Sequence, residues 1–443
     1  MTVRVKLCAI ARNEGPYLVD WVAHHLHFGF DAVEVWVNAT DDPSIELLRG
    51  VAAVRPEVSW RQVDRLRDEC IAQGKVFQHR AYARLARRAR DAGFSHVAFL
   101  DLDEYWTPRD FRSSIHEFLP KDPDVNVVSF QWGVGVPDPE RRPFEPPLTP
   151  PVRFQLDSHV KSASRLDDSV RRYVMHTART TSGTALLVRQ PFGGGDRVPE
   201  DVLVRTWSDV PEAFVLHATN RSQVEYVASL AKGRRQAGAE ADFNTDRFGF
   251  VPTEAPVLTL RPDPTALTAY DDARRDLLAR IDADELIERS RSLVRRRAAE
   301  VIDRVVHDPA LMASLSTALR GVDDRALDEA YPGWNDRIVW WVDAVEERDD
   351  RTVVVGWAYT APEHHVLEFS LRDAAGREWG DLRVVATDRV EVGQERADAP
   401  VRCGFEIEVP EPLRADTGTL VLQVRVAGAP SSEARRLPHP VRG

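Results

Sequence analysis

One stretch constrains the fold of this chain more than any other: the apolar run 96–100, which is followed at once by Asp101, Asp103 and Glu104. A short apolar run of this kind predicts a buried strand. Burying a carboxylate is costly unless the group is paired or bound to a metal, so this strand is expected to end at a site. The alternative is a solvated acidic turn at a strand exit, and the neighbouring segments decide between the two.

The chain before this strand alternates between strand and helix patterns. Strands are predicted over 3–11, 32–37 and 58–63, and helices over 17–28, 42–48 and 73–92. This alternation predicts an α/β fold with a doubly wound, mostly parallel sheet that carries helices on both faces. Ligands of such sheets bind beyond the carboxyl ends of the strands. Asn13, Glu14, the segment 38–42 and the acidic group at 101–104 all fall on that edge, which favours a site there.

Length and charge limit the class of protein. A chain of 443 residues predicts two or three domains, since one hydrophobic core rarely grows past roughly 250–300 residues. The net charge of -11 argues against a nucleic-acid or anionic-membrane binder. Cys8, Cys70 and Cys403 lie far apart without metal-ligand spacing, which fits a reducing cytoplasm. We expect no signal peptide, and no transmembrane segment because no apolar run reaches the ~18 residues that a span needs.

The sequence pattern changes twice along the chain. Residues 1–262 form the predicted α/β domain, and 263–335 form a helical bridge of two or three helices packed on it, with a plain spacer as the alternative. Residues 336–443 alternate as short strands and predict an accessory antiparallel β-sandwich. The tryptophans of this last domain are expected in its core rather than stacked on sugar. An oligomeric contact through the β-sandwich stays open.

Three segments carry a resemblance to a known family. The first holds Asn13, Glu14, Tyr17, Leu18, Asp20, Trp21 and His25, the second holds Gln78 and then Leu100, Asp101, Asp103, Glu104 and Tyr105, and the third holds His217, Arg221, Ser222, Glu225 and Tyr226. They resemble bacterial glycosyltransferases of the family 2 and family 92-like type, with their Asn-Glu-x-x-Tyr-Leu-x-Glu-Trp-x-x-x-His and Leu-Asp-x-Asp-Glu-Phe motifs. The chain departs from the family at Asp20, Ala218 and Arg221. Its 38–41 loop matches the family's Asp-x-Ser-Thr-Asp loop only in part.

The resemblance implies a GT-A fold, a divalent cofactor (Mn²⁺ or Mg²⁺), and inverting transfer of a hexose from a nucleotide-diphosphate donor, with a UDP-sugar favoured. The acceptor would be a glycan or a small molecule. Asp103 is expected to bind the metal directly, with Asp101 contacting the ribose or the metal through water and His217 completing the metal site. Glu104 is expected to orient the loop. The residues expected to bind the nucleotide sugar are Ala11, Asn13, Glu14, Asn38, Asp41, Gln78, Asp101, Lys161 and His176.

The catalytic base is left open among three carboxylates. Asp196, Glu200 and Asp201 follow the glycine-rich loop 193–195, where a base would lie across the donor sugar from the diphosphate. The sequence does not rank them.

Two other functions remain in competition. A haloacid dehalogenase-type phosphotransferase also places Asp-x-Asp on Mg²⁺, but its motif lies near the N-terminus, whereas here three predicted strands precede Asp101. A non-catalytic glycan-binding protein on a transferase scaffold is left open by Asn38 and Ala218. Hydrolysis of a sugar nucleotide that requires Mn²⁺ would separate the three functions.

Overall fold

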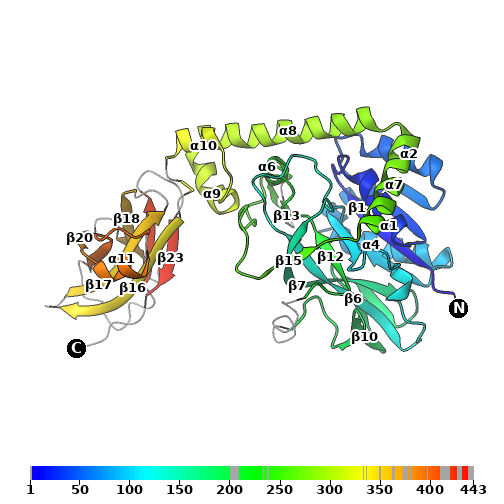
Figure 1. The fold of residues 1–443 in the computed structure, drawn as a ribbon, viewed down its shortest axis with the longest axis horizontal. Coiled ribbons are helices and arrows are strands. Elements are labelled where there is room, and N and C mark those ends of the chain that lie inside the picture. The colour runs from blue at the N-terminus through cyan, green and yellow to red at the C-terminus, as the bar shows by residue number, and fades with distance from the viewer. Residues whose placement is uncertain are drawn as a thin grey trace. The chain divides into compact units, whose positions relative to one another are not determined.

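The computed structural model describes residues 2–199, 209–232, 234–236, 239–332, 334–335, 337–348, 351–361, 365–372, 378–379, 382–396, 398–409, 420–426 and 432–437. The chain forms two compact units, Met1–Asn244 with Phe250–Ala299, and Thr245–Gly249 with Glu300–Gly443 (Figure 1). The three-part division at 262/263 and 335/336 stays a prediction. Within the described residues, no helix combines the length and the apolar character needed to cross a bilayer.

The first unit opens with the predicted alternation of strands and helices. Its elements are β1 (Val5–Ala11), α1 (Leu18–His27), β2 (Ala32–Val37), α2 (Ser44–Val54), β3 (Val58–Gln62), α3 (Asp64–Ala72), α4 (Phe77–Asp91) and β4 (His96–Phe99). The strands β3, β2, β1 and β4 lie side by side in that order and run parallel. Their carboxyl ends therefore meet at one edge of the sheet.

Alternate residues of β1 enter two different cores. Leu7 and Ala9 pack in the cluster that includes α1 and α2, whereas Cys8 packs in the cluster of α3 and α4. Successive side chains of a strand point to opposite faces of its sheet, so helices cover both faces of β1. The predicted doubly wound α/β class is confirmed.

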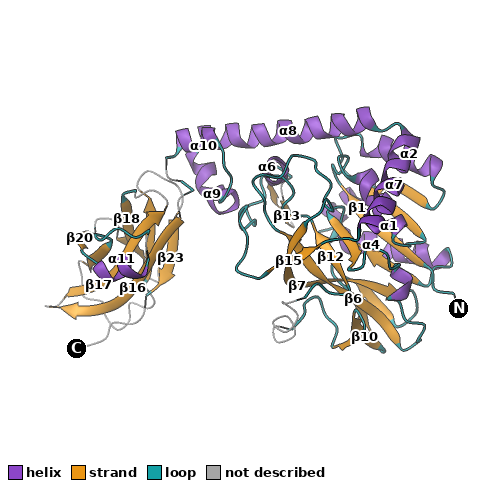
Figure 2. Ribbon diagram, viewed as in Figure 1, coloured by secondary structure: helices purple, strands orange, loops and turns teal. Residues whose placement is uncertain are grey.

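The second half of the same eleven-stranded sheet is mixed in direction (Figure 2). Its strands are β5 (Glu104–Pro108), β6 (Val125–Gly135), β7 (Val152–Arg165), β10 (Thr184–Leu187), β11 (Gln190–Phe192), β12 (Ala213–His217) and β15 (Val257–Leu260). β7 runs antiparallel to both β4 and β6, and β12 pairs with β5 and β6. These pairings bring β7 and β12 to the end of β4.

Short elements and two long helices complete the unit. They are η1 (Ile115–Glu117), β8 (Val170–Tyr173), β9 (Ala178–Thr180), α6 (Gln223–Leu230), β13 (Arg234–Gln236), β14 (Ala239–Ala241), α7 (Pro264–Ile281) and the start of α8 (Asp284–His307). α7 packs against α1 and α2, with Tyr270 and Leu277 in their core cluster. The expectation that helices after 263 pack on the α/β sheet domain holds for α7.

Among its described residues, the second unit contains the end of α8, two antiparallel sheets and three further helices. The sheets are β16 (Arg337–Arg348), β17 (Arg351–Ala361), β21 (Gly404–Val409) and β20 (Arg383–Thr387), and β19 (Glu378–Trp379), β18 (Leu367–Arg372), β22 (Val421–Val426) and β23 (Ser432–Arg436). The helices are α9 (Pro309–Leu319), α10 (Arg325–Ala330) and α11 (Val390–Glu395). Phe369 of one sheet contacts Phe405 of the other, with ring centroids 4.8 Å apart. The sheets therefore face each other, which confirms the predicted antiparallel β-domain.

Candidate functional site

A buried lysine holds the acidic turn after β4. Lys161 of β7 is 2% exposed, and its Nζ lies 3.1 Å from Asp101 Oδ2 and 3.0 Å from Glu104 Oε2. The same Glu104 oxygen accepts the backbone N–H of Asp101 at 2.9 Å. Burial raises the pKa of Glu104 to about 7, although Lys161 opposes the shift. Glu104 thus orients the turn, and the ammonium group that we expected near a diphosphate pairs with two carboxylates.

Asp103 faces a histidine from β12. His217 Nε2 lies 3.5 Å from Asp103 Oδ2, because β12 pairs with β5 in a register that sets His217 opposite Glu104. Burial alone would raise the pKa of Asp103, but the positive field of His217 and Arg221 outweighs it and holds the pKa well below its usual range. Burial lowers the pKa of His217, yet Asp103 outweighs that effect and the net shift is upward. The strand-to-helix junction predicted around His217 is present.

The Asp103 and His217 side chains are close enough for both to contact one cation. Ligands ~2.1 Å from an octahedral cation stand about 3 Å apart when they are adjacent, close to the separation of this pair. Among the described residues, no group of three or more His, Cys, Asp or Glu side chains is placed to hold a metal ion. The residues present fit a cation that takes two protein ligands and completes its shell with substrate oxygens. Asp101 pairs with Lys161 instead of adding a third ligand.

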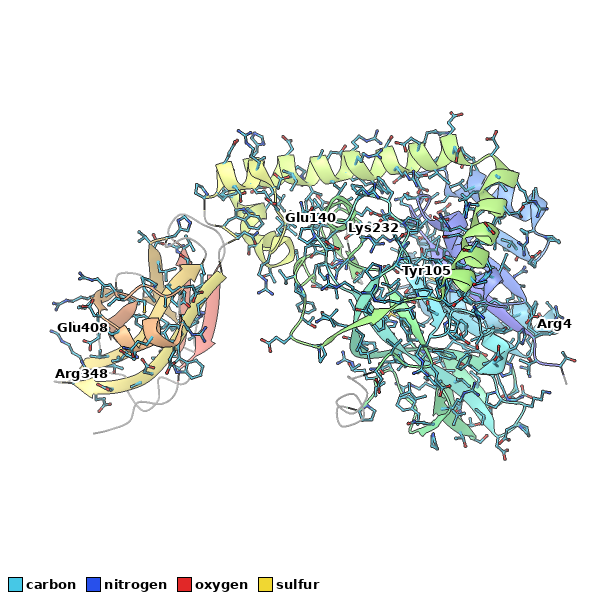
Figure 3. All side chains as sticks on the ribbon, in the orientation of Figure 1. Arg4, Tyr105, Glu140, Lys232, Arg348 and Glu408 are labelled. Carbon is cyan, nitrogen blue, oxygen red and sulfur yellow. The ribbon has the colours of Figure 1, made fainter. Side chains whose placement is uncertain are left out.

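Two cations, Arg221 of the third resembling segment and Lys232 shortly after it, lie at the same edge. The Arg221 guanidinium lies over the Tyr17 ring at 4.0 Å and donates to the Leu102 carbonyl at 3.2 Å. Glu14 forms ion pairs with Arg221 at 3.6 Å and with Lys232 at 2.5 Å. Lys232 is labelled in Figure 3. The turn after β1 is therefore joined by ion pairs to residues just before and just after α6.

The ends of β1 and β2 are linked by amide side chains. Asn13 adopts a positive φ of 57°, and its Oδ1 accepts the backbone N–H of Asp41 at 2.7 Å. Asn38 Nδ2 donates to the Ala11 carbonyl at 3.3 Å. The Asp41 carboxylate is 66% exposed and pairs with Arg297 at 2.9 Å. The structure thus brings all four predicted residues to the carboxyl edge of the sheet.

Gln78 and His176 each bond to a neighbouring protein group. Gln78 Nε2 donates to the Tyr82 hydroxyl at 2.8 Å, and the Tyr82 ring stacks on Phe99 at 4.0 Å. His176 Nδ1 lies 3.2 Å from the Val160 carbonyl oxygen, and burial lowers its pKa to about 4. Gln78 therefore orients the Tyr82 ring that packs on β4, and His176 contacts the backbone of β7.

Of the three candidate bases, one is described. Asp196 is exposed, and its backbone carbonyl accepts the N–H of Val160 at 3.2 Å, so the glycine-rich loop runs against β7. Glu200 and Asp201 lie outside the described residues.

The sequence analysis did not assign two residues that lie at this edge, Trp132 and His159. The Trp132 ring centroid lies 4.3 Å from that of His217, 5.0 Å from that of His159 and 5.2 Å from that of His176. These residues come from four separate segments of the chain, and no spacing in the sequence connects them. An aromatic residue in an apolar strand is normally read as core, so no signal distinguished Trp132.

Buried polar atoms without a partner gather at the same place. Among the described residues, those at this edge are Glu104 Oε1, Tyr105 OH, Trp132 Nε1, His217 Nδ1 and Arg221 Nε. Tyr105 is labelled in Figure 3. Buried polar groups in proteins nearly always have a hydrogen-bond partner, so these atoms would bond to ordered water or to a polar ligand.

Comparison with known proteins adds little to this geometry. No protein-family model matches the sequence, and no curated protein matches it. The crystal structure of S. aureus TarS is similar with a TM-score of 0.23 and 11% sequence identity, over 100% of this chain and 78% of that one. At this TM-score the likeness carries no argument about function.

Proposed function

We propose that this chain is a metal-dependent, inverting glycosyltransferase. It would move a sugar from a nucleotide-diphosphate donor, with a UDP-sugar favoured, to a hydroxyl group of a glycan or a small molecule. The observation that carries the proposal is the Asp103–His217 pair, at 3.5 Å, on the carboxyl edge of a parallel sheet. This edge is where ligands of open α/β sheets bind.

The charges around the pair suit a diphosphate. Mn²⁺ or Mg²⁺ held by Asp103 and His217 would neutralise, as a Lewis acid, the charge that builds on the leaving diphosphate. Arg221 and Lys232 border the same edge, and each is paired with Glu14. An incoming diphosphate would compete with Glu14 for these two cations, and Arg221 would bind phosphate oxygens through two parallel N–H groups.

The nucleoside would lie over the ends of β1 and β2. Asn13 and Asn38 are buried there, and Asp41 is exposed. Together they present amide and carboxylate groups suited to the hydrogen-bonding edge of a base or to ribose hydroxyls. This placement supports the roles assigned to them from the resemblance.

Calorimetry with UDP tests the proposal. We expect binding that requires Mn²⁺ or Mg²⁺, disappears with EDTA, and is lost in Asp103→Asn because one of the two protein ligands to the metal is removed. Asp272→Asn is the matched control, since Asp272 is a 65% exposed surface carboxylate of the same unit. Equal affinity in EDTA would refute the metal assignment. Cleavage of a phosphomonoester without any nucleotide-sugar binding would instead favour a phosphotransferase.

A further inference from the structure

Strand β7 contains a β-bulge at the proposed active site. Where β6 contributes Trp132 alone, β7 contributes the three residues 157–159, and the register of the two strands shifts at this point. Bulges occur often beside active sites, where the extra residues turn a side chain in a direction that regular pleating does not allow. We therefore examine which side chains of residues 157–159 this bulge directs toward the proposed site.

Hydrogen bonds from both sides hold the bulge in place. Gln131 Nε2 of β6 donates to the Asp157 carbonyl at 2.9 Å. On the other side, the Val198 N–H donates to the Ser158 carbonyl at 2.6 Å, and an isolated bridge joins His159 to Arg197. The bulge is thus fixed between β6 and the segment after the glycine-rich loop.

The bulge presents a carboxylate–imidazole pair. His159 Nδ1 lies 2.6 Å from Asp157 Oδ1, and the same oxygen accepts the backbone N–H of His159 at 2.8 Å. A carboxylate partner places the ring proton on Nδ1, which leaves the lone pair on Nε2. The His159 side chain is 25% exposed, so a substrate can approach it. A ring oriented in this way is the arrangement that proteins use for taking a proton from a hydroxyl group.

One indole contacts both this pair and a proposed metal ligand. The Trp132 ring centroid lies 5.0 Å from that of His159 and 4.3 Å from that of His217, and His217 faces Asp103. The Asp157–His159 pair therefore lies at the same edge of the sheet as the proposed diphosphate site, as a base for a single displacement must.

We propose that His159 is the general base of the glycosyl transfer and that Asp157 is its positioning residue; the assignment rests on the proposed function. His159 Nε2 takes the proton of the acceptor hydroxyl while that oxygen forms its bond to the anomeric carbon. The bond from the anomeric carbon to the diphosphate oxygen breaks, and its electron pair leaves on the diphosphate. Among the described residues, Asp157, His176 and Arg197 are charged or titratable neighbours of His159. Lys161 lies two positions further along β7, and the backbone carbonyl of Asp196 accepts the N–H of Val160.

The test measures turnover and donor binding in the full-length chain. His159→Gln is expected to keep its melting temperature and its affinity for UDP with Mn²⁺, while kcat for sugar transfer or donor hydrolysis falls by about 10²–10⁴-fold. Added imidazole is expected to restore part of the activity of His159→Ala. Asp157→Asn should lower kcat and move the acidic limb of its pH profile, an effect that a purely structural role would not produce. NMR should show a product with the anomeric configuration inverted.

His116→Gln is the matched control, because His116 pairs with Asp31 at 3.2 Å on the same unit and is similarly exposed. Its kcat should equal that of the unaltered chain. Unchanged kcat in His159→Gln, together with a large loss in Asp196→Asn, Glu200→Gln or Asp201→Asn, would overturn the assignment in favour of that carboxylate. Parallel loss of UDP binding, melting temperature and kcat in His159→Gln would make His159 structural, and retained configuration would exclude a single displacement. If the unaltered chain binds no nucleotide with Mn²⁺, the proposed function fails and this assignment fails with it.

Discussion

Three carboxylates that stand within four positions of one another acquire different roles through partners that are distant in sequence. Glu104 is fully buried and is held by Lys161, which also pairs with Asp101. Asp103 points the other way, toward His217. Buried charge is tolerated when it is paired, and because Lys161 pairs with Asp101 and Glu104, Asp103 is the carboxylate of the three that pairs with a histidine. The sequence shows the three acids, but only the pairing of β7 and β12 decides which of them binds a metal in the proposed site.

At the same scale, His217→Ala tests the second proposed ligand. We expect the apparent affinity for Mn²⁺ to fall by about 10–100-fold, the range over which even partners of metal ligands act. The melting temperature of the metal-free chain should stay nearly unchanged, because His217 Nδ1 has no partner among the described residues and Asp103 retains the field of Arg221. Electron paramagnetic resonance of free Mn²⁺ measures the affinity. Reduced apo stability with unaltered Mn²⁺ affinity would show that His217 is structural.

At the scale of elements, local signals predicted the parallel half of the sheet and failed where pairing is non-local. Strand β2 has the predicted bounds, and β1, β3 and β4 lie within the predicted stretches. The single helix expected over 73–92 is wrong at its start: α3 ends at Ala72, Gly74 adopts a positive φ of 60°, and the Lys75 N–H donates back to the Cys70 carbonyl at 2.8 Å. A glycine with positive φ is a common helix stop, so this break was readable from Gly74.

The site could be predicted only in part, and for a physical reason. The carboxyl edge of β1, β2 and β4 follows from alternation alone, and it located Asn13, Asn38 and Asp103. The bulge at 157–159 depends on how β6 and β7 align. The alignment of two strands joined by a long connection cannot be deduced from the sequence pattern of either strand alone. The sequence therefore did not predict that Trp132 and His159 lie at the candidate site.

Gly15→Ala tests the contact between the turn after β1 and helix α8. A Cβ at Gly15 would lie 2.2 Å from Ser290 Oγ and 2.8 Å from Asp42 Oδ2, whose oxygen also accepts the Gly15 N–H at 2.7 Å. Overpacking of this kind costs about 1–3 kcal/mol, so we expect the free energy of unfolding to fall by that amount. Chemical denaturation measures it. Gly193→Ala is the control, because nothing lies within 4 Å of a Cβ there. Unchanged stability in Gly15→Ala would mean that α8 can move away without loss.

At the scale of the whole molecule, the α/β class and the antiparallel β class were both predicted correctly, because the hydrophobic periods of helices and strands differ. The chain changes from helical spacing to alternation near 338, and each pattern buries its apolar face in a different core. Tyr270 and Leu277 enter the core of the first unit. Their helical spacing predicted a buried face but not which surface would cover it.

The first unit also buries several histidines in the neutral form. The backbone N–H of Trp106 donates to His25 Nε2 at 3.3 Å, so His25 Nδ1 carries the proton and donates to the Trp21 carbonyl at 2.8 Å. Burial lowers the pKa of His25 to about 3. Burial, reinforced by Arg165, lowers the pKa of His96 to about 4. Protonating either ring would place a charge in the core, and at His25 it would also remove the acceptor of the Trp106 N–H.

These shifts predict a loss of stability in mild acid. Because the folded pKa values lie below the ordinary histidine value of about 6.5, the unfolded chain binds more protons between about pH 6.5 and about pH 3–4. The free energy of unfolding should therefore decrease as the pH falls through this window, by about 1.4 kcal/mol per pH unit for each such histidine. Denaturant unfolding of the full chain at a series of pH values from about 7.5 to about 4.5 measures the slope. His25→Gln should be less stable than the unaltered chain near neutral pH and show a shallower slope. A slope in His25→Gln equal to that of the unaltered chain would contradict the assignment, since it would mean that burial does not depress the pKa of His25.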